Sequence, residues 1–286
     1  MPFAISIEPT NRCQLACIEC PTHNHSIEIK KGDISLELFE KIIKEIHHQT
    51  FYLNLYFQGE PLLHNQITQM ISIAKKYRIY TVLSTNAQNL DEPLAQRIVK
   101  SGLSKIIISM DGMTANTYNK YRIGGNIDKV KTAVETLIRV KKELELNNPK
   151  IIVQFLVHRF NEHEIKTFKQ WARPLNIIAE LKTMQIYNDF SFVPTKARYS
   201  RYELKENRWQ LKKIKKNRCF RIWSQCVIRY DGSLLPCCYD KEGIFYMGNI
   251  KEKSLKELWH SKAFNDFRLK ILKSKHTIKM CNNCPE

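Results

Sequence analysis

Three cysteines close to the start of the chain have a spacing that could bind a metal cluster. Cys13, Cys17 and Cys20 follow the pattern Cys-x3-Cys-x2-Cys, directly after the strand-like run 3–10. Zinc sites normally use four ligands, and only His23 or His25 could supply a fourth nearby. Three thiolates instead suit a [4Fe–4S] cluster that leaves one iron open. An open iron can bind a co-substrate.

The other six cysteines form a second group near the end of the chain. They are Cys219, Cys226, Cys237, Cys238, Cys281 and Cys284. Nine cysteines would suit disulfides in a secreted chain, but residues 21–218 contain none. In a reducing cytosol such clustering indicates metal sites. We therefore expect a cytoplasmic protein with two metal centres.

Alternating strand and helix patterns must position the first group. Strand-like runs occur at 3–10, 51–59, 79–87, 104–112, 150–158 and 177–184. The segments between them carry apolar residues at helical spacing, with start signals at Ser35 and at Asp91. Six such repeats predict parallel strands, in either a doubly wound sheet or a barrel-like arrangement.

Polar residues gather where each predicted strand gives way to a loop. They lie at 8–11, 58–60, 84–86, 109–112 and 158–161. Any one of them alone would be read as a turn. Since ligands of parallel α/β folds gather at the carboxyl ends of the strands, five in succession predict a pocket.

The last third of the chain has a different character. From about Tyr187 to Asn217 the periodicity fails and the charge rises, which indicates a linker. Beyond it we expect a hairpin around Asp231-Gly232, one amphipathic helix over 254–272 and a closing Cys-x2-Cys. The predicted domains are 1–190, a linker at 191–218, and 219–286.

The first cysteine group resembles that of the radical S-adenosylmethionine (SAM) superfamily. That family carries Cys-x3-Cys-x2-Cys after the first strand of a partial (β/α)6 TIM-type barrel. The resemblance implies that SAM chelates the open iron and is cleaved reductively to a 5′-deoxyadenosyl radical, which abstracts hydrogen from a substrate. It also implies an external electron donor such as flavodoxin or ferredoxin. The protein's share is to position this chemistry.

The resemblance extends to residues beyond the cysteines. Gln58-Gly59-Glu60-Pro61 is similar to the family's Gly-Gly-Glu-Pro motif, which makes Gly59 and Glu60 the expected contacts of the SAM amine. Further candidate contacts to SAM or substrate are Ser84, Asn86, Ser109 at the ribose position, and Arg122. The sequence departs from the family at Gln58, which replaces a glycine, and at Glu19, where many members have an aromatic residue.

The second group resembles the SPASM/twitch extension of radical SAM enzymes, a small α+β iron–sulfur domain. A further cysteine-rich run typical of two-cluster members is missing, so we expect one auxiliary [4Fe–4S] cluster. Its expected ligands are Cys219, Cys237, Cys281 and Cys284. Cys238 could replace Cys237, and Cys226 is expected to be a buried structural thiol. A zinc site with four cysteine ligands is the alternative.

Composition limits the choice of partners. A net charge of +18 and a pI near 9.5 fit an anionic substrate, nucleic acid, acidic membrane lipid or a lysine-rich surface. The lysines are scattered apart from the run at 211–218, which disfavours nucleic acid. No apolar run has the length of a membrane span, so no membrane partner is expected.

These observations leave three functional hypotheses. The leading one is a radical SAM enzyme of the oxidoreductase type, a twitch dehydrogenase of a sugar- or aminocyclitol-like alcohol. The second is a maturase that modifies a peptide or protein, disfavoured because the predicted barrel begins at residue 3. The third is a zinc- or iron–sulfur-containing nucleic-acid-binding protein. The general base is open, with His158, Asp111 and Tyr187 as candidates.

Overall fold

The structure is a computed structural model that describes residues 1–23, 30–213 and 217–285. His25 and part of the basic run at 211–218 lie outside these residues. The chain divides into two compact units, described separately below. Residues 1–12, 25–83 and 214–286 form the first unit, and 13–24 and 84–213 form the second. The domain boundaries predicted from the sequence remain a prediction.

In the first unit the strands are mostly parallel. Their order is β10-β9-β1-β2-β3, and only the β9–β10 pair is antiparallel. The strands are β1 (Ala4–Ile7), β2 (Tyr52–Asn54), β3 (Tyr80–Thr85), β9 (Gln225–Ile228) and β10 (Leu234–Leu235). The boundary between the units falls within β3, after Leu83. The predicted hairpin at Asp231-Gly232 is confirmed by β9 and β10.

The helices of the first unit are α1 (Leu36–Ile46), α2 (Ile67–Lys76), α7 (Arg221–Ser224), α8 (Leu255–Trp259) and α9 (Lys262–Ser274). Ser35 caps α1 as predicted, because its side chain accepts the N–H of Leu38. The single helix predicted over 254–272 is wrong. Ser261 is extended and its Oγ accepts the N–H of Phe264, so it starts a new helix and divides the segment into α8 and α9.

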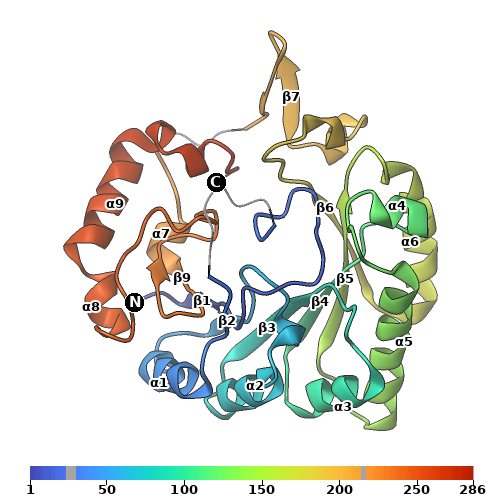
Figure 1. Ribbon diagram of the computed structural model, residues 1–286, viewed down its shortest axis with the longest axis horizontal. Helices are drawn as coiled ribbons and strands as arrows, with labels where there is room; N and C mark the ends of the chain where they lie inside the picture. The colour runs from blue at the N-terminus through green and yellow to red at the C-terminus, as the bar shows by residue number, and fades with distance from the viewer. Residues whose placement is uncertain (24–29, 214–216, 286) are drawn as a thin grey trace. The chain divides into compact units, whose positions relative to one another are not determined.

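In the second unit β4 (Lys105–Ser109), β5 (Lys150–Val157) and β6 (Ile178–Thr183) are parallel neighbours, in that order (Figure 1). Its helices are α3 (Glu92–Lys100), α4 (Ala115–Asn119), α5 (Ile127–Glu143) and α6 (Ile165–Ala172). The predicted α/β class with parallel strands is thus confirmed. Asp91 caps α3 as expected. At five residues, α4 is too short to show a helical period in the sequence.

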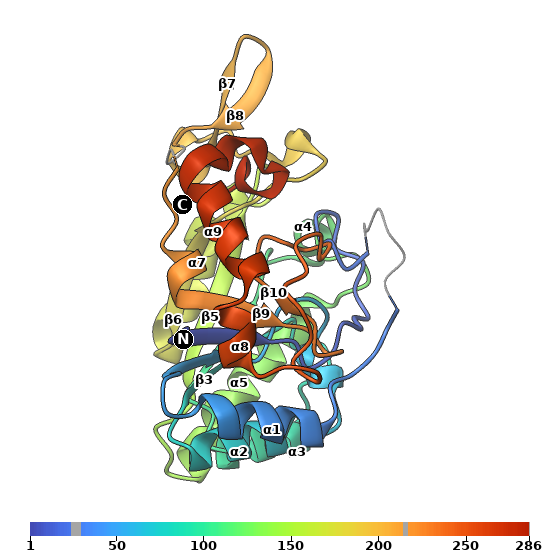
Figure 2. The same ribbon diagram turned by 90° about the vertical axis from the view of Figure 1, so that its left-hand side faces the viewer.

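The stretch predicted as a linker contains regular structure. β7 (Tyr202–Lys205) and β8 (Arg208–Leu211) form an antiparallel hairpin, which Figure 2 shows as a separate two-stranded ribbon. Tyr202 and Leu211 are buried in an apolar cluster with Leu15 and Cys17. The strands have four residues each, too few for alternation to be visible in the sequence. The stretch therefore packs within the second unit.

No apolar run in the sequence is long enough to span a membrane, and the helices of the structure can be compared with this finding. Among the described residues, none of the helices combines the length and the apolar character that crossing a bilayer needs.

Candidate active site

The first cysteine group lies on a loop that pairs with the segment after α4. Ala16 N–H donates to the carbonyl of Ile123 at 3.0 Å, and Ile18 N–H donates to that of Tyr121 at 3.3 Å. Cys17 is buried, whereas Cys13 and Cys20 are half-buried. The loop thus offers two partly accessible thiols and one covered thiol.

Two nitrogen-bearing side chains contact these thiols. Asn86 Nδ2 lies 3.8 Å from Cys13 Sγ, and Arg122 Nη1 lies 3.7 Å from Cys17 Sγ. Burial raises the pKa of the Cys17 thiol, and the Arg122 guanidinium opposes that rise. Both contacts favour the thiolate, which is the form that binds iron. The structure therefore brings Asn86 and Arg122, both predicted site residues, to the cysteine loop.

Arg122 also forms an ion pair with a buried carboxylate. Its Nε lies 2.6 Å from Asp111 Oδ2, and the other oxygen of Asp111 accepts the N–H of Leu156 at 2.7 Å. Asp111 is 1% exposed, and its carboxylate orients the Arg122 guanidinium.

Of the other predicted residues, Ser84 and Ser109 lie at the carboxyl ends of β3 and β4 and are half-buried.

The three candidate general bases differ in accessibility. Asp111 is paired as described above. His158 is fully buried against the rings of Tyr121, Phe160 and Phe192, and burial lowers its pKa to about 4. Tyr187 is 38% exposed. His158 is thus enclosed by aromatic rings.

Gly59 and Glu60 lie beside the residues that lead into the cysteine loop. Gly59 has φ +71°, and a Cβ there would lie 2.4 Å from the carbonyl oxygen of Thr10. Glu60 N–H donates to the carbonyl of Arg12 at 2.7 Å. The Glu60 carboxylate is 2% exposed and accepts the N–H of Leu62 at 3.0 Å, which caps a short 3-10 turn. Only glycine at position 59 allows the backbone to approach the Thr10 carbonyl this closely.

Gln58, the residue that departs from the family motif, contacts the C-terminal part of the first unit. Its side-chain amide donates to the carbonyl of Lys241, and the Lys241 ammonium lies 4.3 Å from the centre of the Phe57 ring. The nearby Glu8 carboxyl accepts the N–H of Gln58 at 3.3 Å. Burial raises the pKa of Glu8 to about 7, against the opposing charge of Arg229.

Glu19, the second departure, has a role that sequence reasoning missed. It is 3% exposed, and its carboxylate accepts backbone N–H groups from Tyr187, Asn188 and Asp189. An acidic residue between two cysteines was a visible signal. Its partners were not visible, because they are 168–170 positions away in the sequence.

The second cysteine group is mostly buried. Cys237, Cys281 and Cys284 are buried, and Cys219 is half-buried. Burial, together with smaller contributions from the nearby Cys284 and Cys219, raises the pKa of the Cys281 thiol to about 12. The pKa of the Cys237 thiol is also raised, chiefly by its hydrogen bond with Cys238 and by burial, with a smaller contribution from the charge of Cys284. The four cysteines that the sequence selects thus lie near enough to influence one another electrostatically.

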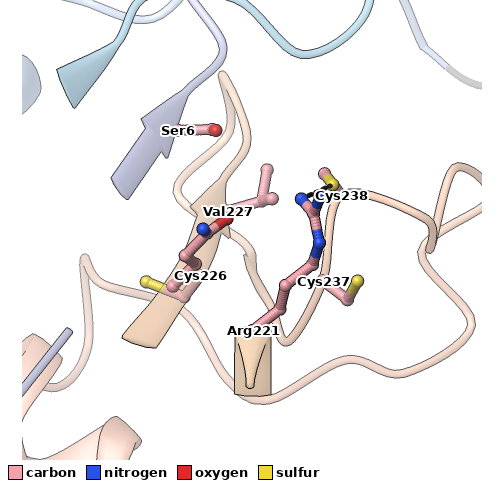
Figure 3. A pocket seen from close by; sticks show the side chains of 7 residues that line it. Ser6, Arg221, Cys226, Val227, Cys237 and Cys238 are labelled. Carbon is pink, nitrogen blue, oxygen red and sulfur yellow. Dashed lines mark hydrogen bonds between the residues drawn. The ribbon is translucent and has the colours of Figure 1, made fainter. Parts of the chain in front are cut away.

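Cys237 and Cys238 have different partners beside a small pocket (Figure 3). Arg221 Nη1 donates to Cys238 Sγ at 3.6 Å, whereas Cys237 Sγ accepts the N–H of Tyr239 at 3.5 Å. The pocket is lined by Ser6, Arg221, Gln225, Cys226, Val227, Cys237 and Cys238. Cys226 on β9 is 1% exposed, as expected of a structural thiol.

Both cysteine sets offer donors that fit iron–sulfur clusters. Within residues 1–23, 30–213 and 217–285, no three His, Cys, Asp or Glu side chains converge closely enough to hold a single metal ion. Ligands of a four-iron cluster sit at separate corners and need not converge on one atom. The thiol-only donor sets are compatible with iron–sulfur clusters.

Comparisons with known families match both regions. The profile of the "Radical SAM superfamily" matches residues 7–172, and that of "SPASM: Iron-sulfur cluster-binding domain" matches residues 219–285. A curated relative from Pyrococcus furiosus, the "Tungsten-containing aldehyde ferredoxin oxidoreductase cofactor-modifying protein", is 25% identical. That alignment covers 97% of this chain and 86% of the relative.

Solved structures share the fold at low sequence identity. BtrN in complex with AdoMet and 2-DOIA aligns with a TM-score of 0.65 at 18% identity, over 100% of this chain and 94% of that one. The anSMEcpe protein with bound AdoMet gives 0.69 at 18%, over 100% and 85%. Streptococcus suis SuiB gives 0.73 at 14%, over 94% and 68%.

Proposed function

Because the chain belongs to the radical SAM superfamily, we propose that it is an enzyme that oxidises a small alcohol by hydrogen abstraction, with one auxiliary cluster. The family match favours an enzyme over the nucleic-acid-binding alternative. The observation that supports the auxiliary cluster is that Cys237, Cys281 and Cys284 are buried and Cys219 is half-buried, within the residues that the iron–sulfur domain model matches.

The first cysteine loop would hold the SAM-binding cluster. Cys13, Cys17 and Cys20 are its proposed ligands, and the cluster with SAM supplies a radical able to abstract hydrogen. Arg122, oriented by Asp111, stabilises the Cys17 thiolate and offers a cation to the SAM carboxylate. Glu60 is the proposed acceptor for the SAM amine.

Four cysteines around the second centre favour a cluster that transfers electrons. With all four ligand positions supplied by protein, no iron is open to a substrate, and the centre's chemistry would be electron acceptance. In an alcohol oxidation, a carbon-bound hydrogen atom, a hydroxyl proton and one electron leave the substrate, and a carbonyl forms. An external donor of the flavodoxin or ferredoxin kind would supply electrons to the first cluster, which suits a cytoplasmic protein.

The charge and the relatives favour a small anionic substrate. The net charge of +18 attracts anions. BtrN aligns over nearly its whole length, and the P. furiosus relative is described as modifying a cofactor. A sugar- or aminocyclitol-like alcohol carrying a phosphate would satisfy both the chemistry and the charge.

Peptide modification is the second candidate. The anSMEcpe protein also aligns over the whole of this chain, and one of its structures contains a bound peptide. The two candidates separate by substrate: incubation with a peptide library and with sugar phosphates should yield oxidised product from only one of them.

Anaerobic reconstitution tests the proposal. We expect two four-iron clusters, so about eight irons per chain, and 5′-deoxyadenosine when SAM and a reductant are added. The Glu60→Ala variant should keep its iron and bind or cleave SAM poorly. About one zinc per chain and no SAM cleavage would contradict the proposal. Unchanged cleavage in the variant would remove Glu60 from the SAM site.

A further inference from the structure

The loop that bears the first three cysteines holds a buried carboxylate whose oxygens are occupied by the backbone. Glu19 Oε2 accepts the N–H groups of Tyr187 at 2.7 Å and Asn188 at 3.0 Å, and Oε1 accepts that of Asp189 at 2.7 Å. Three consecutive N–H groups around one carboxylate form an anion-binding nest. Charge-assisted bonds of this kind are the stronger hydrogen bonds of proteins.

The captured residues begin a segment that packs around the same loop. Asp189 caps the 3-10 turn Phe190–Phe192 by accepting the N–H of Ser191. Phe192 and Val193 then lie in the apolar cluster that contains Cys17. The polar contact at Glu19 and the apolar contact at Cys17 therefore fix opposite ends of the segment 187–193 to one loop.

We propose that Glu19 is a positioning residue that couples the order of segment 187–193 to the state of the cysteine loop. An aromatic side chain at position 19 could not accept these three N–H groups, so the carboxylate is the chemical requirement. Loading the loop with iron fixes its backbone, and Glu19 passes that constraint to residues 187–189. The segment becomes a firm wall of the site when the cluster is present.

A second carboxylate, which binds backbone N–H groups just after segment 187–193, provides a matched control. Glu162 accepts the N–H groups of Thr195 and Lys196, each at 3.2 Å. It precedes α6 and is not part of the cysteine loop. Removing it should loosen 195–196 while leaving the connection from the loop to 187–189 in place.

Amide hydrogen exchange of the full chain tests the first part. In metal-free protein, Glu19→Ala should speed exchange at Tyr187, Asn188 and Asp189 by about 10–100-fold, whereas Glu162→Ala should not. Glu19→Gln keeps one acceptor oxygen, so its exchange rates at 187–189 should lie between those of Glu19→Ala and Glu162→Ala. It also carries the test if the alanine variant does not fold. Unchanged exchange at 187–189 in both Glu19 variants would overturn the proposal.

The coupling itself is tested by iron loading, and this arm rests on the proposed cluster at Cys13, Cys17 and Cys20. Iron should slow exchange at 187–189 in the wild type and in Glu162→Ala, but much less in either Glu19 variant. An equal slowing in all of them would refute the coupling. If the wild type binds no iron, the proposed function fails, while the metal-free measurement still decides the role of Glu19.

Discussion

The two cysteine groups differ in how much of each thiol is covered. In the first group Cys13 and Cys20 are half-buried, and polar side chains contact the sulfurs of Cys13 and Cys17. In the second group three of the four selected cysteines are buried. A centre that takes a co-substrate needs access and charged neighbours, whereas one that only accepts electrons is better protected.

The largest expected effect comes from removing the covered thiol of the first group. Cys17→Ala should abolish SAM cleavage and lower the iron content from about eight to about four per chain, because two thiols cannot hold a four-iron cluster. Iron analysis and chromatography of 5′-deoxyadenosine measure both effects. Cys226→Ala is the matched control, since Cys226 is a buried thiol outside both ligand sets, and it should keep all its iron. Full cleavage in Cys17→Ala would break the comparison.

The second group should respond in a different way. Cys281→Ala should also lose about four irons per chain, yet it should still cleave SAM, because the first cluster is intact. Turnover of the substrate to its oxidised product should be lost. Parallel assays of 5′-deoxyadenosine and product separate the two activities. If SAM cleavage fell together with product formation, the two centres would not have the separate roles that their burial indicates.

Much of this architecture was predictable from the sequence because it depends on local patterns. The alternation of strands and helices, the hairpin at Asp231-Gly232 and the caps at Ser35 and Asp91 are set by neighbouring residues. The single helix over 254–272 was wrong because Ser261 competes for the backbone, and hydrophobic spacing alone does not register such competition.

The contacts that organise the site were less predictable. Glu19 and Gln58 were recognised only as departures from a family motif, and their partners lie 168–170 and 183 positions away. Sequence spacing carries no information about such pairs without the fold. The stretch predicted as a linker illustrates the same point. Tyr202 and Leu211 are buried because they pack in one apolar cluster with Leu15 and Cys17, which are distant in the sequence.

The neighbouring cysteines 237 and 238 offer a sharper test of the second group. Cys237→Ser should lose the auxiliary iron, whereas Cys238→Ser should retain it, because the Arg221 guanidinium contacts the Cys238 sulfur and no such cation contact is described at Cys237. Iron content and the visible absorption of the cluster measure the difference. The reverse result would make Cys238 the ligand and would place Arg221 beside the cluster.

A smaller effect is expected at the glycine motif of the first unit. Gly59→Ala combines a positive φ with a Cβ 2.4 Å from the Thr10 carbonyl oxygen, and should destabilise the fold by about 1–3 kcal/mol and weaken SAM binding. Gly124→Ala is the control, because it has φ +82° but its nearest neighbour is 3.9 Å away. Denaturant unfolding of both variants separates the clash from the strain. Equal losses would mean that the close approach at Gly59 contributes nothing.

The last test asks whether Glu8 connects β1, which precedes the first cysteine group, with β9, which precedes Cys237. Glu8 follows β1, accepts the N–H of Tyr230 after β9 at 3.4 Å, and has a pKa raised by burial to about 7. A raised carboxyl pKa favours the folded state only while the group is protonated. Stability should therefore fall by on the order of 3 kcal/mol as the pH rises from about 4.5 through 7. Glu8→Gln should flatten this slope, which denaturant unfolding at a series of pH values measures. An unchanged slope would mean that other groups set the pH dependence and that Glu8 does not link the two strands energetically.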